Sequence, residues 1–103
     1  MDQDTIIIKG GLSETRPATP EIQEIVDKVR PQLEEKTNHK YEKFKAVEYK
    51  SQVVAGQNYF IKIDLGCSHF LHMKVYCGLS GEDDLELQGY QTNKTKNEEL
   101  TYF

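Results

Sequence analysis

The spacing of the apolar residues changes once along this chain, and that change constrains the fold more than any other feature. Between residues 20 and 36 the apolar side chains recur with the i, i+3, i+4, i+7 spacing of one helix face, at Ile22, Ile25, Val26, Val29 and Leu33. From Tyr41 onward apolar and polar residues alternate, as they do in strands that bury one face. One amphipathic helix followed by strands predicts an α+β fold.

The ends of the predicted helix carry residues with clear positional preferences. Thr19 can cap the first turn with its hydroxyl, and Pro20 suits the first helical position because the N–H that it lacks would be unbonded there. Pro31 cannot donate to the carbonyl of Asp27, so we expect a kink or weak point at that position. The helix is expected to end near residues 36–38.

Glycines and polar clusters divide the alternating region into strands. We expect four of them, around residues 46–53, 58–65, 70–77 and 85–92. Short turns join consecutive antiparallel strands, so the prediction is a four- to five-stranded antiparallel sheet wrapped across one N-terminal helix. The 103 residues fit a single domain, 1–103, in which residues 1–18 form a largely extended N-terminal arm.

Charge and hydropathy exclude two classes of partner. The chain has 17 acidic and 13 basic residues, a formal net charge of −4, and no long block of either sign. We therefore expect no nucleic acid and no membrane as partner. The start of the chain is acidic where a secretory signal needs a basic region, and no apolar run approaches the length of a bilayer span.

The two cysteines indicate a reducing environment. If Cys67 precedes the strand that contains Cys77, ten residues of strand separate the two by roughly 33 Å. A disulfide tolerates at most about 7 Å between Cα atoms. We therefore expect free thiols and a cytoplasmic location.

No combination of residues points to catalysis. His69 and His72 are three positions apart, so on one strand they point to opposite faces and cannot share a metal. The sequence contains none of the C-x-x-C, H-E-x-x-H, G-x-S-x-G or glycine-rich phosphate-loop motifs. We expect no enzyme activity, no catalytic residues, no cofactor and no metal site.

Three successive apolar residues break the alternation between the first two predicted strands. Val53, Val54 and Ala55 lie where a polar turn is expected. An exposed apolar tip usually has a partner. The alternative is a strand buried on both faces, or a bulge, with only Ala55 and Gly56 turning. The pattern by itself does not separate these readings.

Several motifs now combine into a resemblance. Gln52-Val53-Val54-Ala55-Gly56 matches the Q-x-V-x-G signature of the cystatins. The other matching segments are Gly10-Gly11-Leu12-Ser13-Glu14, Pro17-Ala18-Thr19-Pro20-Glu21-Ile22-Gln23, Gln32-Leu33-Glu34-Glu35-Lys36 and Gly89-Tyr90-Gln91. Together they resemble the stefins, the type 1 cystatins. The resemblance implies the cystatin-like fold and reversible, tight-binding inhibition of papain-like cysteine proteases such as cathepsins.

The resemblance also implies a protease-binding site made of three segments at one edge of the sheet. They are the arm with Ile8, Lys9, Gly10 and Gly11, the first hairpin tip with Gln52, Val53, Val54, Ala55 and Gly56, and the second hairpin tip with Leu79, Ser80 and Gly81. In the family this edge plugs the active-site cleft. Stefins often carry Pro where this chain has Ser80, and they tend to begin only a few residues before the glycine, whereas residues 1–9 precede it here. Lys9, directly before Gly10, would present a charge to a subsite that is apolar in many of these proteases.

Two further expectations follow from the same resemblance. The alternative function is that of a structural protein cross-linked through surface Gln and Lys into an insoluble layer, with Gln3, Gln57, Gln88, Lys94 and Lys96 as candidates. The chain is expected to be a monomer that can also form a domain-swapped dimer by exchange of the helix and first strand.

Overall fold

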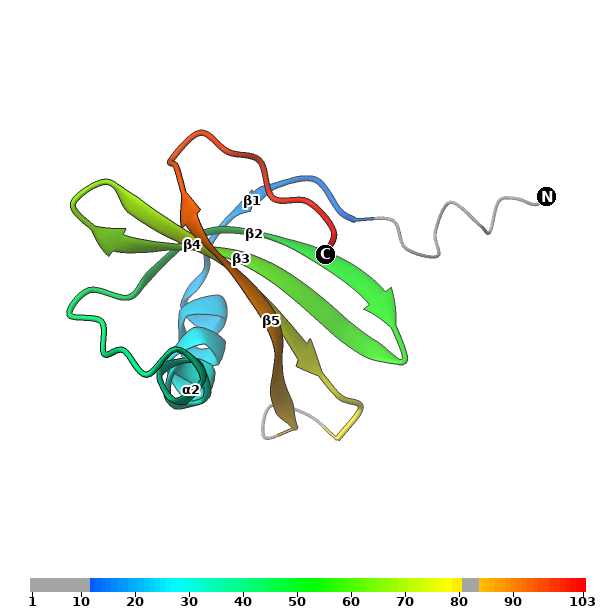
Figure 1. The fold of residues 1–103 in the computed structure, drawn as a ribbon. Helices are drawn as coiled ribbons and strands as arrows, with labels where there is room; N and C mark the ends of the chain where they lie inside the picture. The colour runs from blue at the N-terminus through cyan, green and yellow to red at the C-terminus, as the bar shows by residue number, and fades with distance from the viewer. Residues whose placement is uncertain (1–11, 81–83) are drawn as a thin grey trace.

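One helix and five strands form the part of the chain that the structure, a computed structural model, describes: residues 12–80 and 84–103 (Figure 1). The elements follow in the order β1 (Arg16–Pro17), α2 (Pro20–Thr37), β2 (Lys45–Val54), β3 (Gly56–Gly66), β4 (His69–Cys77) and β5 (Leu85–Lys94). The strands form one antiparallel sheet in the order β1-β2-β3-β4-β5. The predicted α+β fold class is confirmed.

Helix α2 begins and ends as its sequence predicts. The hydroxyl oxygen of Thr19 accepts a hydrogen bond from the N–H of Ile22 at 3.2 Å, and Pro20 is the first helical residue. At the other end Asn38 adopts the left-handed conformation, with φ 55°, and its N–H donates to the carbonyl of Glu34. The helix continues through Pro31, so the expected weak point does not end it.

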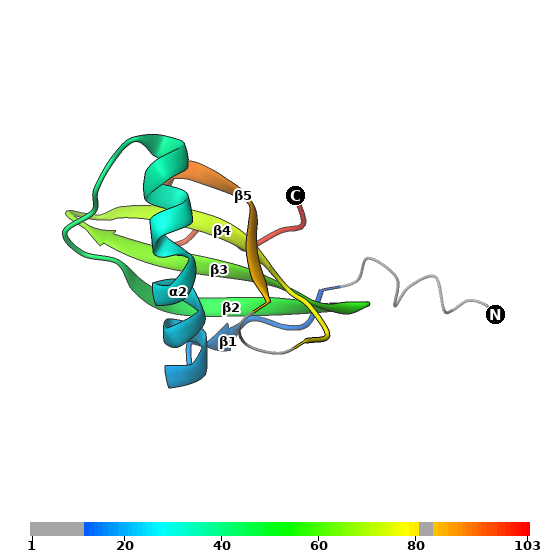
Figure 2. The same ribbon diagram turned by 90° about the horizontal axis from the view of Figure 1, so that it is seen from below.

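The helix lies across one face of the sheet, as Figure 2 shows. Its apolar stripe meets the strand residues that face it, and the buried members of this core include Ile22, Val26, Val29, Leu33, Ile61, Ile63, Leu71, Met73, Val75 and Leu87. Two glutamines of the helix add polar anchors. Gln23 accepts from the N–H of Ala46 at 2.8 Å, and Gln32 accepts from the N–H of Leu87 at 3.0 Å. The helix is therefore hydrogen-bonded to two separate strands of the sheet, β2 and β5.

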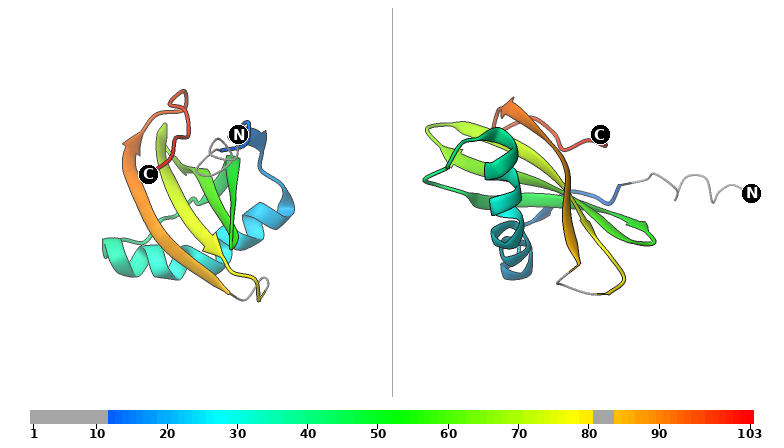
Figure 3. Two further views of the ribbon diagram at one scale, coloured as in Figure 1. Left: turned by 90° about the vertical axis from the view of Figure 1, so that its right-hand side faces the viewer. Right: turned by 60° about the horizontal axis from the view of Figure 1, so that its bottom comes forward.

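The opposite face of the sheet, which we call the outer face, is covered by the C-terminal segment, residues 95–103 (Figure 3). Leu100 is fully buried, and the rings of Tyr102 and Phe103 lie 5.7 and 5.6 Å from the ring of Phe60. The ammonium group of Lys74 donates to the backbone oxygen of Phe103 at 2.9 Å. The chain terminus thus closes a second core on the outer face.

The N-terminal arm joins the sheet earlier than the sequence indicates. The expected first regular element begins at Thr19, but Arg16 and Pro17 already pair with Tyr49 and Glu48 as strand β1. The sequence shows no alternation here because a two-residue edge strand is too short to display a period. No helix among residues 12–80 and 84–103 is long and apolar enough to span a membrane.

Candidate functional site

The β2–β3 hairpin ends in an exposed apolar tip. Val54 pairs with Gly56, so Ala55 stands alone at the apex. Val53 is 68% exposed and Val54 is 41% exposed. Of the three apolar residues that break the sequence alternation, Val53 and Val54 therefore end strand β2, and Ala55 forms the turn to β3. We call Val53–Gly56 the first tip.

Gln52 differs from the residues that follow it. Its side chain is only 4% exposed, and its amide oxygen accepts a hydrogen bond from the side-chain amide of Asn58 at 2.8 Å. Asn58 is the register partner of Gln52 across the hairpin. The glutamine of the Q-x-V-x-G signature thus supports the hairpin from the outer face of the sheet, while the valines are displayed.

Gly56 is held where no other residue fits without strain. Its φ of +102° lies in the region that favours glycine. A Cβ at this position would overlap the carbonyl oxygen of Cys77 and lie 3.2 Å from the Cα of Gly78. The glycine therefore lets the first tip rest directly on the backbone that leaves β4.

The second tip, of which Leu79 and Ser80 are described, lies at the same end of the sheet (Figure 3). The pairing of Gln57 with Cys77 places the end of β4 beside the start of β3. Leu79 is 83% exposed, and Ser80 is exposed as well. At the base of this loop the N–H of Gly78 donates to the carbonyl of Asp84 at 2.9 Å. Gly81 lies outside the described residues.

The described part of the arm, residues 12–18, runs along β2. The N–H of Ser13 donates to the carbonyl of Ser51 at 2.9 Å, and the hydroxyl of Ser13 accepts from the N–H of Ser51 at 3.0 Å. Since the arm runs antiparallel to β2, Ser13, opposite Ser51, lies closer to the first tip than Arg16, opposite Tyr49. Ile8, Lys9, Gly10 and Gly11 lie outside the described residues.

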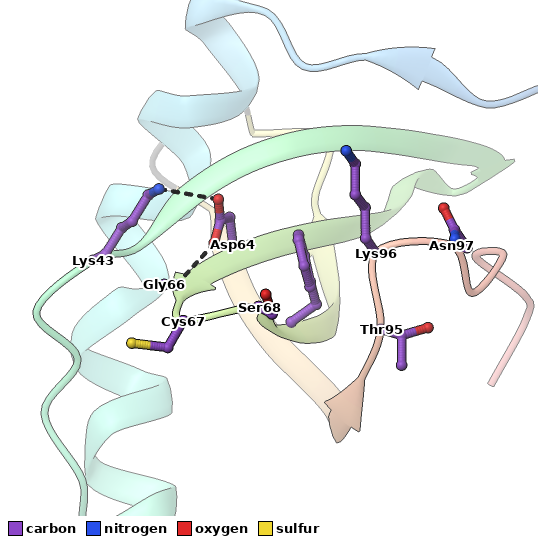
Figure 4. Close-up of a pocket in the computed structure, with 9 residues that line it drawn as sticks. Lys43, Asp64, Gly66, Cys67, Ser68, Thr95, Lys96 and Asn97 are labelled. Carbon is purple, nitrogen blue, oxygen red and sulfur yellow. Dashed lines mark hydrogen bonds and ion pairs between the residues drawn. The ribbon is translucent and has the colours of Figure 1, made fainter.

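A hollow of about 480 Å³ lies at the other end of β3, by the β3–β4 turn (Figure 4). Its charged groups are partly paired, with Lys43 at 3.1 Å from Asp64. The N–H of Gly66, the larger effect, and the charge of Lys43 both lower the pKa of Asp64. Among the described residues no group of three or more His, Cys, Asp or Glu could hold a metal. Nothing here competes with the apolar tips as a site.

Comparison with known proteins bears on the meaning of this exposed edge. The sequence matches the Cystatin domain over residues 10–97, which includes the arm glycines, both tips and the sheet between them. The chain belongs to the cystatin family. Three relatives place it more closely. It is 77% identical over 101 residues to Stefin-3 of Mus musculus, covering 98% of each chain, and 71% identical over 103 residues to Cystatin-A of Rattus norvegicus, covering 100% of each. It is 58% identical over 98 residues to Leukocyte cysteine proteinase inhibitor 1 of Sus scrofa, covering 94% of this chain and 95% of the relative. The chain is therefore a cystatin of the stefin type, as its motifs predict.

The sequence of this cystatin did not reveal two residues that shape the tips. Asn58 and Tyr76 are register partners on β3 and β4, and both lie on the outer face next to the first tip. Asn58 bonds Gln52, and the hydroxyl of Tyr76 donates to the carbonyl of Ala55. In the sequence they are marked only as hydrogen-bonding residues at outward strand positions near a turn. The sheet register decides which groups their side chains bond.

Proposed function

We propose that this cystatin is a reversible, tight-binding inhibitor of papain-like cysteine proteases, cathepsins among them, that it acts as a monomer, and that it is not an enzyme. The observation that carries the proposal is the display of exposed apolar side chains from two hairpin tips at one end of the sheet: Val53, Val54 and Leu79. Clustered exposed apolar residues mark binding surfaces. The relative from Sus scrofa is by name a cysteine proteinase inhibitor.

The apolar side chains of the tips suit a cleft because the strands that carry them are paired in the sheet before binding. Both project from strands that are bonded into the sheet, so little conformational entropy is lost when they enter a protease. Full burial of a Val or Leu side chain contributes about 1.5–3 kcal/mol. The first tip presents a closed turn in place of an extended peptide, so inhibition requires no covalent step and the protease is recovered on dissociation.

The exposed valines of β2 provide the test. Full-length protein titrated into active papain is expected to remove activity in stoichiometric proportion, and dilution is expected to restore it. Val53→Lys places a charge in the first tip and is expected to abolish tight inhibition. Val47→Lys is the matched control, since Val47 is also exposed on β2 but lies six positions before the first residue of the tip. Absence of inhibition by the folded wild-type protein contradicts the proposal.

The arm is proposed to fill subsites on the nonprimed side of the cleft, with Ile8 as the apolar contact, Gly10 and Gly11 as the hinge, and the two tips on the primed side. Deletion of residues 1–9 is expected to leave folding intact, because the first described backbone hydrogen bond of the arm is made by Ser13. Loss of one buried apolar side chain removes about 1.5–3 kcal/mol, roughly tenfold to over a hundredfold in Kd. The change should appear mainly in the off-rate.

Lys9 is proposed to set selectivity within the arm. Replacement of Lys9 by Val is expected to tighten binding to proteases with an apolar subsite and to weaken it where that subsite is acidic. For the deletion of residues 1–9, inhibition constants equal to those of the full-length protein would show that the two tips carry the inhibition alone. Rate constants from progress curves at several inhibitor concentrations measure both effects.

We also propose the reducing cytoplasm as the compartment of this cystatin. Cys67 lies in the turn before β4 and Cys77 is the last residue of that strand, so the two are too far apart for a disulfide to join them, which supports this location. Fractionation of cells that express the full chain tests the location. The alternative role of a cross-linked structural protein has less support, since the exposed Gln88 and Lys96 are residues that any solvated surface carries.

A further inference from the structure

A single side chain from a neighbouring strand reaches the apex of the first tip. The hydroxyl of Tyr76, on β4, donates a hydrogen bond to the carbonyl oxygen of Ala55. Ala55 has no partner in the β2–β3 pairing, since Val54 pairs with Gly56 across the turn. Its carbonyl is therefore held from outside the hairpin, by the strand that leads to the second tip.

The same tyrosine stands where the two tips meet. A Cβ built on Gly56 would lie 3.1 Å from the hydroxyl of Tyr76 and 3.2 Å from the Cα of Gly78. Tyr76 is followed directly by Cys77 and Gly78, which lead into the second tip. The phenol thus bonds the first tip to the strand that carries the second.

Gln52, Asn58 and Tyr76 lie side by side on three neighbouring strands, next to the first tip. Tyr76 is the register partner of Asn58, which in turn pairs with Gln52 and donates its side-chain amide to the side chain of Gln52 at 2.8 Å. Strands β2, β3 and β4 are therefore paired through these three residues, next to Val53 and Val54. Of these three residues, Tyr76 is the one whose side chain bonds the apex residue, Ala55.

We propose that Tyr76 is a positioning residue for protease inhibition: its hydroxyl fixes the apex of the first tip relative to the second before the protease arrives. The proposal rests on the function proposed above. With its hydroxyl bonded to Ala55, Tyr76 acts through the tip and not by touching the protease. An apex that samples several conformations would bind only when it visits the right one, and the apparent affinity would fall by that fraction.

Tyr76→Phe tests this, because it removes the hydroxyl and keeps the ring. The net strength of one hydrogen bond corresponds to roughly a three- to tenfold rise in Kd. Preorganisation predicts that this rise comes from a slower on-rate with papain, while the off-rate stays close to wild type. The matched control is Tyr102→Phe, which removes the same group from the C-terminal segment and is expected to change neither rate.

A second readout separates this inference from the inhibitory function. Amide hydrogen exchange of Ala55 and Gly56 in the free protein is expected to accelerate in Tyr76→Phe and to stay unchanged in Tyr102→Phe. Should wild-type protein fail to inhibit papain, this readout still decides whether Tyr76 holds the apex. Unchanged exchange and unchanged on-rate overturn the proposal. A rise in off-rate alone also overturns it, because it would indicate direct contact with the protease.

Discussion

At the scale of single residues, substitution of two glycines with positive φ distinguishes an effect on protease inhibition from an effect on stability. Gly56 has φ +102° at the first tip, and Gly66 has φ +89° at the far end of β3. Gly56→Ala adds a Cβ that overlaps the carbonyl of Cys77, so both the backbone and the tip must shift. We expect a loss of about 1–3 kcal/mol in the free energy of unfolding, together with weakened protease inhibition.

The control for this prediction is Gly66→Ala. The nearest neighbour of its Cβ would be the side chain of Lys43 at 3.7 Å, which is ordinary contact. It should therefore lower the free energy of unfolding through backbone strain while leaving inhibition unchanged. Urea unfolding and papain titration of both variants measure the two effects. An equal loss of inhibition in both variants would show that the tip geometry has no special role.

At the scale of elements, the C-terminal segment acts as the second cover of the sheet. Leu100 is fully buried, although the segment has no regular secondary structure. Leu100→Ala is expected to lower the free energy of unfolding by about 2–5 kcal/mol, because it leaves a cavity on the outer face. Inhibition by the protein that remains folded should be unchanged, since both tips stand outside this segment.

Its neighbour provides the control for the same measurement. Thr101 is exposed, and Thr101→Ala is expected to change the free energy of unfolding by less than about 0.5 kcal/mol. Urea unfolding followed by far-ultraviolet circular dichroism measures both variants. Similar midpoints for the Leu100 and Thr101 variants would show that the segment only rests on the sheet and contributes no core.

At the scale of the whole molecule, stability should depend on one buried histidine. His72 is 1% exposed on the outer face, and neither ring nitrogen has a hydrogen-bond partner within the described structure. Burial, followed by the charges of Lys94 and Lys62, lowers its pKa to about 4, against smaller opposing effects of Glu98 and Glu48. The folded state therefore holds the histidine neutral where the unfolded state already binds a proton.

The sign of the pH dependence follows. The full contribution of neutral His72 is present above its unfolded pKa of 6.5 and is lost as the pH falls toward 4, at about 1.4 kcal/mol per pH unit. The carboxylates with lowered pKa, such as Asp64, lose their contribution only below their unfolded values near 4. Between pH 6.5 and 4.5 the histidine should therefore dominate, with a loss of roughly 2–3 kcal/mol in the free energy of unfolding.

His72→Leu should flatten this dependence, because it removes the titrating group without breaking a hydrogen bond. His69→Leu is the control, since His69 is exposed on the same strand and should keep the wild-type slope. Urea unfolding at pH 7.0, 6.0 and 5.0 measures the three proteins. Parallel slopes for wild type and the His72 variant would contradict the assignment.

The sequence by itself determined the elements and located the apolar run at the first tip. The helix from Pro20, its Thr19 cap and the strands on either side of Ala55 follow from local periodicity and capping, which depend on neighbouring residues alone. The Q-x-V-x-G motif and its companion segments indicated the family for the same reason, because they are contiguous. The pairing of β1 with β2 was not visible, since two residues carry no period.

Only the tertiary structure decided which residues meet across strands. That Val53 and Val54 are exposed, that Gln52 is buried against Asn58 and that Tyr76 reaches Ala55 all depend on the register of three strands. Register is set by the summed packing of the sheet against helix and C-terminal segment, and a shift of one residue would turn each of these side chains to the other face. No local pattern in the sequence contains that sum. The apolar run could therefore be read from the sequence, whereas its exposure and the hydrogen bonds made by Asn58 and Tyr76 could not.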